Sequence, residues 1–372
     1  MLDELKKLRK NIDVLDKKFI KLITKRLKIV TEIGKIKKKH GLSIHDPIRE
    51  KKMLSSRCEE AKLNGVSSCL VKDLLKRIMR ESYFNENQEG FKKICLNLRP
   101  IIIIGGLGKM GQLFNKMLKL SGYKVHILEK NDWHNAKKIL NNPMMVIVSI
   151  PVLLVKPIIL KLSSLPKDCI LIDLTSIKHR PLNVMLNVHS GPVLGLHPMF
   201  GPECKNLVKQ LIIVCHGRYP EKYEWFLEQM RIWGVKLYVV NAIQHDYYMN
   251  FIQILRYFIT FSYGLNFLEE DVNLKKMLDL SSPIYHIEIA MIGRFFNQNP
   301  ELYADIMMSS GNNIFFIKRY YKILSKLITI LEKKDKEKFI DYFKKIKTWF
   351  KSYAKKLSKK SDDILGQLND NI

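Results

Sequence analysis

Apolar side chains near the start of the chain recur at alternating spacings of three and four residues. The series runs through Leu5, Leu8, Ile12, Leu15, Phe19, Leu22, Ile29, Ile33 and Ile36. This spacing predicts one long amphipathic helix with a coiled-coil-like seam, and neither Gly nor Pro interrupts it before Gly34. The missing member of the series is Arg26. Because a buried Arg needs an anion, either a Glu on a partner helix or a bound ligand must accompany it.

A second helix is expected to begin at Pro47, since Pro is favoured in the first turn of a helix. Arg49 and Glu50 follow in that turn. On the first helix, Lys37 lies eleven residues beyond Arg26 and about 20° away around the axis. The two long side chains can therefore converge on one small dianion.

A third helical stretch covers residues 70–86 and ends in Ser82 and Glu86, four positions apart on one face. Cationic groups with a few hydrogen-bonding acids, all on helices, describe a pocket for a small and multiply anionic ligand. Residues 1–90 resemble an AroQ-type chorismate mutase, a three-helix protomer that works as an intertwined dimer. The matching residues are Arg9, Arg26, Lys37, Asp46, Arg49, Glu50, Ser82 and Glu86.

This resemblance implies a role for each matching group. The arginines would bind the two carboxylates of chorismate, and Glu50 would hold its hydroxyl. Lys37 and Glu86 would meet the ether oxygen, where negative charge develops as the C–O bond breaks. Glu86 must be protonated to donate there, which an anion-rich site favours.

The hydrophobic pattern changes to α/β after residue 99. Four Ile residues at 101–104 predict a strand that is buried on both faces, and a G-x-G-x-x-G pattern follows it. Gly106 would allow a tight turn, Gly108 would let backbone N–H groups approach a pyrophosphate, and Gly111 would let helix and strand pack closely. A helix and a second strand then lead to Glu129. The pattern predicts dinucleotide binding, with a ligand-free structural turn as the alternative.

The residues expected to bind the dinucleotide are Gly105, Gly106, Leu107, Gly108, Met110, Gly111 and Glu129. Glu129 would accept hydrogen bonds from a ribose 2′-hydroxyl and repel a 2′-phosphate, so NAD is expected rather than NADP. No metal is expected. Residues 144–150 and 169–174 predict further buried strands, and Ser176 and Lys178 follow the second of them at its carboxyl end, where open α/β sheets bind ligands.

His197 stands in the segment Gly-Leu-His-Pro-Met-Phe-Gly-Pro, residues 195–202. Pro198 favours an extended conformation at His197, and the Gly-Pro pair is expected to turn the chain. A lone loop His is often only a surface residue. A rigid apolar loop near the nicotinamide end of a cofactor favours a catalytic role.

From about His245 the pattern is all-helical. Ser282 and Pro283 are expected to cap and begin a helix that is apolar on nearly every side, and that should therefore be buried. It carries Arg294, which Glu288 cannot reach on the same face. Arg294 would then bind a ligand carboxylate or pair with another helix. Residues 333–360 predict a basic amphipathic helix that packs on the rest of the chain.

Residues 99–360 resemble prephenate dehydrogenase in the glycine loop, DLTSIK, GLHPMFGP and the Arg294 helix. The whole chain thus resembles a bifunctional chorismate mutase/prephenate dehydrogenase of tyrosine biosynthesis. The resemblance implies NAD-dependent loss of carbon dioxide from prephenate to give 4-hydroxyphenylpyruvate. His197 would draw the ring hydroxyl proton, Ser176 would orient that hydroxyl with Lys178 nearby, and Arg294 would bind a carboxylate. It also implies a homodimer and possible feedback by tyrosine.

The expected architecture is multidomain, in the order all-α, Rossmann-type α/β, all-α. The expected boundaries are 1–90 for the mutase, 91–98 for a linker, 99–242 for the NAD-binding part, 243–360 for the helical dimerisation part and 361–372 for a tail. Two positions depart from relatives of the dehydrogenase, which often have Arg where this chain has His286 and His where it has Tyr257.

Composition changes this picture little. The chain has 372 residues with 47% hydrophobic side chains, enough for several cores. Its longest apolar tract is interrupted by Pro151, so no membrane partner is expected. Six Cys without a C-x-x-C pair suit a reducing cytoplasm. The net charge of +28 suggests nucleic acid, but it is spread along the chain, and no nucleic-acid partner is expected. One alternative is an arogenate dehydrogenase with a regulatory or dimerising helical module. The other is a basic regulatory protein that uses a dinucleotide as a signal and binds nucleic acid.

Overall fold

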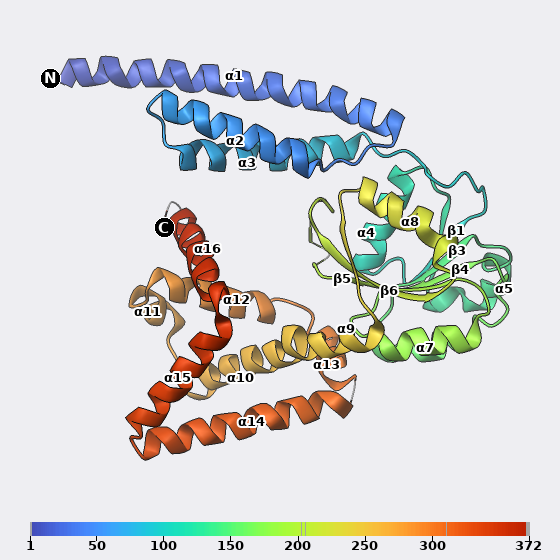
Figure 1. Cartoon of the computed structure of the whole chain (residues 1–372). Helices are drawn as coiled ribbons and strands as arrows, with labels where there is room; N and C mark the ends of the chain where they lie inside the picture. The colour runs from blue at the N-terminus through green and yellow to red at the C-terminus, as the bar shows by residue number, and fades with distance from the viewer. Residues whose placement is uncertain (1, 202, 205, 310, 370–372) are drawn as a thin grey trace. The chain divides into compact units, whose positions relative to one another are not determined.

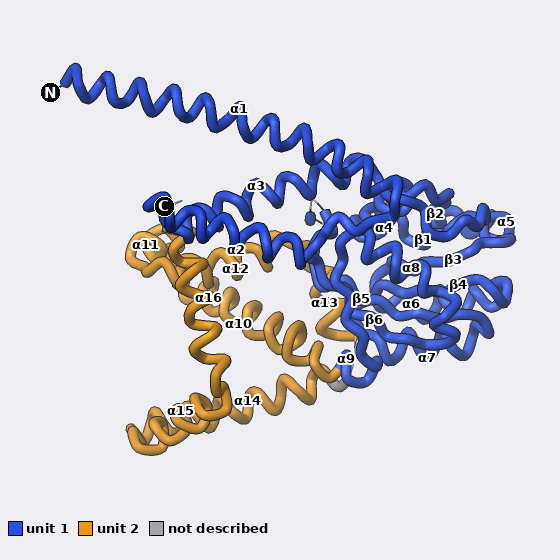
Figure 2. The backbone as a smooth tube through the Cα atoms, turned by 45° about the horizontal axis from the view of Figure 1, so that its top comes forward, with its two compact units in different colours: residues 1–246 blue, residues 247–372 orange. Residues whose placement is uncertain are grey.

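The computed structural model of the chain describes residues 2–201, 203–204, 206–309 and 311–369. The chain divides into two compact units, residues 1–246 and 247–372 (Figure 2). Unit 1 contains a helical module, formed by the first three helices, and a sheet module that follows it. Unit 2 is all-helical. The expected order of all-α, α/β and all-α parts is confirmed.

The helical module consists of α1 (Leu2–His40), α2 (Pro47–Leu63) and α3 (Ser68–Gln88). As the apolar spacing predicts, α1 is a single uninterrupted helix. α2 and α3 pack together, α3 also packs on α1, and the N-terminal part of α1 extends past both (Figure 1). The apolar positions of α1 between Leu5 and Leu22 are consequently exposed in the single chain.

A seven-stranded sheet forms the centre of the sheet module, with strand order β2-β1-β3-β4-β5-β6-β7. The first five strands are parallel, β6 is antiparallel to β5, and β7 is parallel to β6. The strands are β1 (Ile101–Ile104), β2 (Val125–Leu128), β3 (Met145–Val148), β4 (Ile170–Asp173), β5 (Val193–Pro198), β6 (Leu211–Arg218) and β7 (Lys236–Val239). The sequence predicts the first four strands and misses the last three.

Helices cover both faces of this sheet. They are α4 (Lys109–Leu120), the 3₁₀ helix η1 (Lys130–Asn135), α5 (Ala136–Ile139), α6 (Val152–Leu160), α7 (His179–Val188) and α8 (Pro220–Ile232). α4 and α8 lie on one face and α7 on the other (Figure 1), and α6 packs against α7. Ile101 and Ile103 of β1 pack into one core with Phe114 of α4, Phe226 of α8 and Trp233. Burying a side chain of this size contributes about 1.5–3 kcal/mol to folding.

The boundary between the units falls within α9 (Ala242–Met249). The further helical elements of unit 2 are η2 (Asn250–Leu255), α10 (Arg256–Glu269), α11 (Leu274–Asp279), α12 (Pro283–Phe296), α13 (Pro300–Met308), α14 (Gly311–Glu332), α15 (Lys336–Phe350) and α16 (Ser352–Asn369). A small core joins Ile254, Tyr257, Phe295 and Ile306. Tyr257 packs against Phe295 in it and is therefore a core residue.

Three expectations about unit 2 are wrong. Phe295 is the one buried residue among those of α12, because in the single chain the helix packs on α10 and α16 along only part of its surface. The Ser282 side chain makes no capping hydrogen bond, although Pro283 does begin the helix. The helix expected over residues 333–360 is two helices, since Lys351 adopts a left-handed conformation (φ +48°) between α15 and α16.

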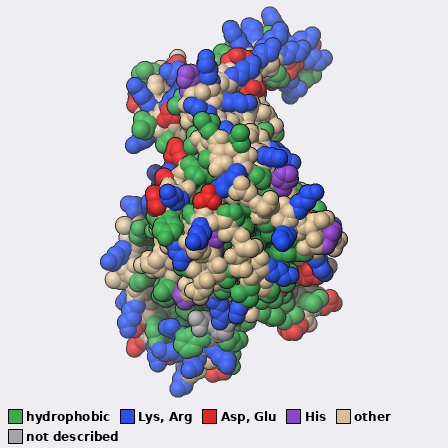
Figure 3. Space-filling view, turned by 90° about the vertical axis from the view of Figure 1, so that its right-hand side faces the viewer, with side chains coloured by type: hydrophobic (Ala, Val, Ile, Leu, Met, Phe, Trp, Pro, Cys, Tyr) green, Lys and Arg blue, Asp and Glu red, His purple; other side chains and the backbone are tan. Residues whose placement is uncertain are grey.

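Lys and Arg side chains are scattered over the face seen in Figure 3, among apolar and other polar groups. The figure therefore agrees with a basic charge that is distributed along the chain. Among the described residues, no helix has the length and apolar character needed to cross a bilayer.

Candidate active sites

The glycine loop follows β1 at the carboxyl end of the parallel strands. Gly105 has a φ of +78°, so the tight turn depends on Gly105 and not on Gly106 as the sequence suggested. A Cβ on Gly106 would lie 2.7 Å from the Ile127 side chain, and one on Gly111 would collide with the backbone of Gly105. Gly111 thus allows α4 to pack closely on the loop, as predicted.

The loop lies at the point where the strand order reverses. β1 has β2 on one side and β3 on the other, and a Cβ on Gly105 would strike the carbonyl of Ser149, just beyond β3. α4 begins at Lys109 with Gly108 as its N-cap. Since the first-turn N–H groups of a helix lack intrahelical acceptors, this end of α4 offers donors to an anion.

Glu129 directly follows the second strand, as predicted, and its carboxylate binds the glycine loop. Its Oε1 atom accepts a hydrogen bond from the backbone N–H of Leu107 at 2.7 Å. Its own N–H donates to Asp132 Oδ2 at 2.9 Å, which closes a capping box at the start of η1. The carboxylate is therefore fixed beside the loop in which a dinucleotide would bind.

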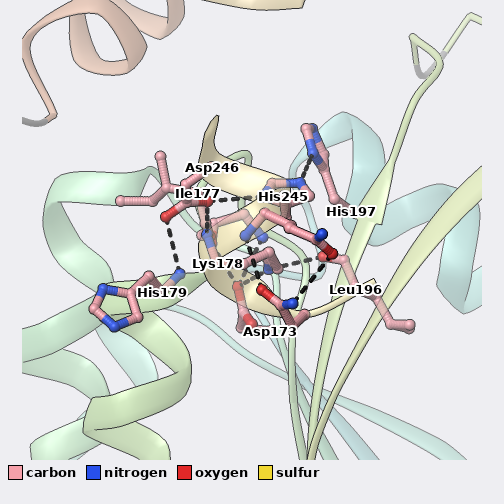
Figure 4. Close-up of polar contacts among 11 residues, drawn as sticks. Asp173, Ile177, Lys178, His179, Leu196, His197, His245 and Asp246 are labelled. Atoms are coloured by element: carbon pink, nitrogen blue, oxygen red, sulfur yellow. Dashed lines mark hydrogen bonds and ion pairs between the residues drawn. The ribbon is translucent and has the colours of Figure 1, made fainter. Parts of the chain in front are cut away.

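His197 lies in strand β5 and is buried, so it is not a surface loop residue. Pro198 is the last residue of the strand, and the extended conformation expected at His197 is confirmed; Pro202 lies outside the described residues. His197 Nδ1 lies 2.8 Å from Nε2 of His245, whose Nδ1 lies 2.7 Å from Oδ1 of Asp246 (Figure 4). We call this chain of three side chains the His197 relay.

The carboxylate at the end of the relay determines the tautomers of both rings. Asp246 also accepts backbone N–H groups of Lys178 at 2.8 Å and His179 at 3.0 Å. Burial raises the pKa of Asp246, but hydrogen bonds from His245 and these two N–H groups outweigh it, so that the pKa is lowered. An ionised carboxylate only accepts, so His245 carries its proton on Nδ1. Its Nε2 then accepts from Nδ1 of His197.

Nε2 of His197 is thereby left as the basic nitrogen of that ring. Burial lowers the pKa of His197 well below 6.5, and the nearby His245 and Lys178 lower it further. The ring is consequently neutral at neutral pH and can take a proton from a bound hydroxyl group.

Lys178 is fully buried, with none of its side chain exposed to solvent. Its Nζ forms an ion pair with Asp173 at the end of β4 and donates to the carbonyl of Leu196 at 2.8 Å (Figure 4). Leu196 precedes His197 in β5. Lys178 therefore holds β4 and β5 together next to the relay, which makes it a positioning residue.

Ser176 and Arg294 are the other two residues predicted from the sequence to act with His197 and Lys178. Ser176 is half-buried in the segment between β4 and α7, and within the described part of the chain its hydroxyl has no hydrogen-bond partner. Arg294 lies in unit 2 on α12 and is exposed in the single chain. It forms no ion pair with a described residue of unit 2, so the pairing with another helix expected as an alternative is not found there. His286, on the same helix, is half-buried.

A second cluster of charged groups lies in the helical module. Arg26 of α1 donates to the Ser82 hydroxyl of α3 at 2.7 Å, and Lys37 donates to Glu86 Oε2 at 2.7 Å. Lys37 also donates to the carbonyl of Ile44 at 2.7 Å. Arg26 has no acidic partner among the described residues, so the internal ion pair considered for it is not formed. The structure thus brings together four of the predicted residues.

Burial is the main influence on the pKa of Glu86. It raises the pKa above the usual 4.5, although Lys37, Arg49 and Arg26 each lower it. The carboxyl group is therefore easier to protonate than an exposed Glu, but the cause is burial and not the anion-rich surroundings expected from the sequence. A neutral Glu86 can donate a hydrogen bond into the site.

Glu50 lies at the edge of this cluster. Its Oε2 accepts from the Tyr83 hydroxyl at 2.7 Å and lies 3.3 Å from Nε2 of His45. Its Oε1 accepts from Lys209 of the sheet module at 2.6 Å. Asp46 caps α2 by accepting from the backbone N–H of Arg49 at 2.9 Å, and both residues are exposed.

Arg9 is far from the other predicted residues. It is exposed on α1, seventeen residues before Arg26, which corresponds to roughly 26 Å along a continuous helix. No side chain spans this distance, so Arg9 cannot join the cluster formed within its own chain.

Sequence reasoning missed His245, Asp246, Asp173, Tyr83 and Lys209. Asp173 stands inside the quoted DLTSIK motif, and its place at the end of a buried strand was a usable signal. The adjacent His245 and Asp246 had no distinctive spacing. They join the site because α9 brings them to the carboxyl edge of β4 and β5.

Three family models match the chain. Residues 8–87 match chorismate mutase type II. Residues 123–222 match the nucleotide-binding domain of prephenate dehydrogenase, and residues 241–345 match its dimerization domain.

Two relatives match over nearly their whole length. The chain is 51% identical over 370 residues to the T-protein of Enterobacter agglomerans, covering 100% of this chain and 99% of that one. It is 47% identical over 370 residues to the T-protein of Haemophilus influenzae, covering 99% and 98%. Among solved structures, prephenate dehydrogenase from Aquifex aeolicus in complex with hydroxyphenyl propionate and NAD+ has a similar fold. The TM-score is 0.54 at 22% identity, over 68% of this chain and 97% of that one.

The fold, the two clusters and these matches define a bifunctional enzyme, a chorismate mutase joined to a prephenate dehydrogenase. The chain belongs to the T-protein family. Its reactions are two consecutive steps of tyrosine biosynthesis, the rearrangement of chorismate to prephenate and the oxidative decarboxylation of prephenate. The resemblance that the motifs indicated is confirmed.

Proposed function

We propose that the cluster of Arg26, Lys37, Ser82 and Glu86 is the mutase site. The substrate carries two carboxylates, and Arg26 and Arg49 supply cationic groups for them. Lys37 and protonated Glu86 stabilise the negative charge that develops on the ether oxygen. The rearrangement needs no nucleophile, since binding the substrate in a reactive conformation and stabilising that oxygen are sufficient.

The proposal for the second step, the oxidative decarboxylation of prephenate, rests on the His197 relay. The hydroxyl on the prephenate ring loses its proton as the ring carbon becomes a carbonyl, and Nε2 of His197 accepts that proton. Asp246 and His245 keep this nitrogen unprotonated beforehand. Ser176 orients the hydroxyl group, Lys178 holds the strand that carries His197, and Arg294 binds a carboxylate of the substrate.

The glycine loop and Glu129 fit NAD as the cofactor. Gly105 and Gly111 keep the loop free of side chains close to the N-terminus of α4, and the carboxylate of Glu129 beside the loop supports a role as acceptor for the ribose hydroxyls. When bound, NAD accepts the hydride that leaves the substrate ring. In Glu129→Ala, the ratio of kcat/KM for NAD to that for NADP should fall, because repulsion of the 2′-phosphate is lost. An unaltered protein with equal kcat/KM for both cofactors would contradict this assignment.

We also propose that the enzyme is a homodimer of the cytoplasm. The exposed apolar stripe of α1 and the matched dimerization domain support a second copy as partner. All six cysteines lie in the described part of the chain and are free thiols, which suits a reducing compartment. Inhibition by tyrosine, implied by the resemblance, is a further part of the proposal.

One coupled assay tests both steps. The purified enzyme is given chorismate and NAD, and 4-hydroxyphenylpyruvate, carbon dioxide and NADH are measured. All three products should form in equal amounts. If prephenate accumulates without NADH, and arogenate in place of prephenate restores NADH formation, the second activity is an arogenate dehydrogenase.

A further inference from the structure

Lys209 belongs to the sheet module but binds a residue of the helical module. It precedes β6, and its ammonium group lies 2.6 Å from Glu50 Oε1 and 5.5 Å from the centre of the Tyr83 ring. Tyr83 in turn donates to the other oxygen of Glu50. One lysine thus makes an ion pair and a cation–π contact with two side chains at the edge of the mutase cluster.

The backbone at Lys209 is unusual for a residue with a side chain. Its φ is +65°, in the left-handed region that favours glycine, and its N–H donates to the carbonyl of Gly234 at 2.8 Å. A glycine or asparagine would form this turn with less strain. The strained conformation places the Lys209 ammonium at Glu50. This contact explains why a lysine occupies the position in place of a glycine or asparagine.

The contacts around Glu50 do not use all the hydrogen-bond acceptor positions of its carboxylate, so a ligand can bind there. A carboxylate has about four acceptor positions. Tyr83 and His45 use those of Oε2, and Lys209 uses one of Oε1. Among the described residues, one acceptor position on Oε1 has no donor, and Lys209 holds the oxygen that carries it.

We propose that Lys209 is a positioning residue of the mutase site, supplied by the sheet module. It holds Glu50 ionised and correctly oriented to accept the hydroxyl of chorismate. This inference rests on the proposed role of Glu50. It follows that the helical module alone lacks one part of its binding site.

The same contact gives a pH signature. The charged and titratable groups that face Glu50 are His45, Tyr83 and Lys209. Burial raises the pKa of Glu50, and Lys209 and Tyr83 outweigh it, so that the pKa is lowered. Without Lys209 the pKa rises, so the loss of chorismate binding in acid should begin at a higher pH.

The test measures mutase kinetics in the full-length enzyme. Lys209→Met should raise KM for chorismate about tenfold, the effect of losing one charge-assisted contact, with kcat nearly unchanged. Lys209→Gly removes the ammonium and relieves the backbone, so it should fold well and show the same defect. Lys209→Arg should restore most of the affinity. Lys222→Met, at an exposed lysine on α8 without a bond to Glu50, is the matched control and should behave like the parent, as should prephenate dehydrogenation in all four variants.

A double-mutant cycle separates this inference from the proposed function. If Lys209 acts through Glu50, adding Lys209→Met to Glu50→Gln should cause no further loss. Additive losses, or a parental KM in Lys209→Met while Glu50→Gln is impaired, would overturn the role of Lys209 and leave the proposed function intact. Parental kinetics in Glu50→Gln itself would instead refute the proposed role of Glu50.

Discussion

Nδ1 of His197 lies 2.8 Å from Nε2 of His245, and the two rings meet edge to face. Because His245 is bound through its other nitrogen to Asp246, this contact determines which nitrogen of His197 carries the proton. The base proposed for the dehydrogenase is therefore positioned by two further side chains, and the sequence motif contains only His197 itself.

His245→Asn should lower kcat for prephenate on the order of 10²-fold, because it removes the ring that holds His197 in its reactive tautomer. KM should change little. His197 acts when neutral and its pKa lies well below 6.5, so the parent rate should rise with pH in the acid range and be level at neutral pH. His179→Asn is the control, since its ring is outside the relay. A His245→Asn enzyme with the parental kcat and pH profile would show that the relay has no catalytic effect.

Glu86→Gln should change the pH dependence of the mutase. Burial raises the pKa of Glu86. In the proposed mutase site, the protonated form is the one that donates to the ether oxygen. Activity should therefore be present below that pKa and decline as pH rises through it. Gln donates at every pH, so the decline should disappear in the variant when mutase kcat is measured from acid to alkaline pH. An unchanged decline would mean that another group titrates.

Arg294→Ala should raise KM for prephenate by a factor of roughly 10 to 100, the equivalent of about 1.5–3 kcal/mol for a lost charge-assisted hydrogen bond. Since Arg294 is exposed in the single chain, the free energy of unfolding, measured by thermal denaturation, should change by less than about 0.5 kcal/mol. KM for NAD and mutase activity serve as controls. Strong destabilisation without a specific change in KM would favour a structural ion pair instead.

Arg9→Ala and Lys37→Ala should each abolish most mutase activity in the pure state. If Arg9 completes the site of a second chain, mixing the two variants under subunit exchange should restore activity. Each mixed dimer would have one site with Arg9 and Lys37 both intact and one site with both lesions. Verified mixed dimers without recovery would show that Arg9 lies outside the site or that each site is built within one chain.

Local rules explain why so much of the fold can be predicted from sequence. The 3-4 spacing from Leu5 to Ile36 requires only helical geometry, and α1 is indeed continuous from Leu2 to His40. The Ile run at 101–104 and the following glycines likewise define a buried strand and a turn. Even there, the sequence assigned the turn to Gly106, while the positive φ belongs to Gly105, because spacing alone does not determine backbone dihedrals.

The sequence by itself determined which residues could do chemistry, since Arg26, Lys37, Glu86 and His197 stand in patterns typical of their families. Only the tertiary structure decided how they are oriented. His245, the partner of His197, comes from α9, 48 residues away along the chain, and Lys209, one partner of Glu50, comes from the turn before β6, 159 residues away. Periodicity describes neighbours on one helix or strand, whereas such contacts depend on how elements distant in sequence pack together. For the same reason, α12 looked buried from its apolar composition and is exposed in the single chain: composition gives the tendency to be buried, and packing decides what covers it.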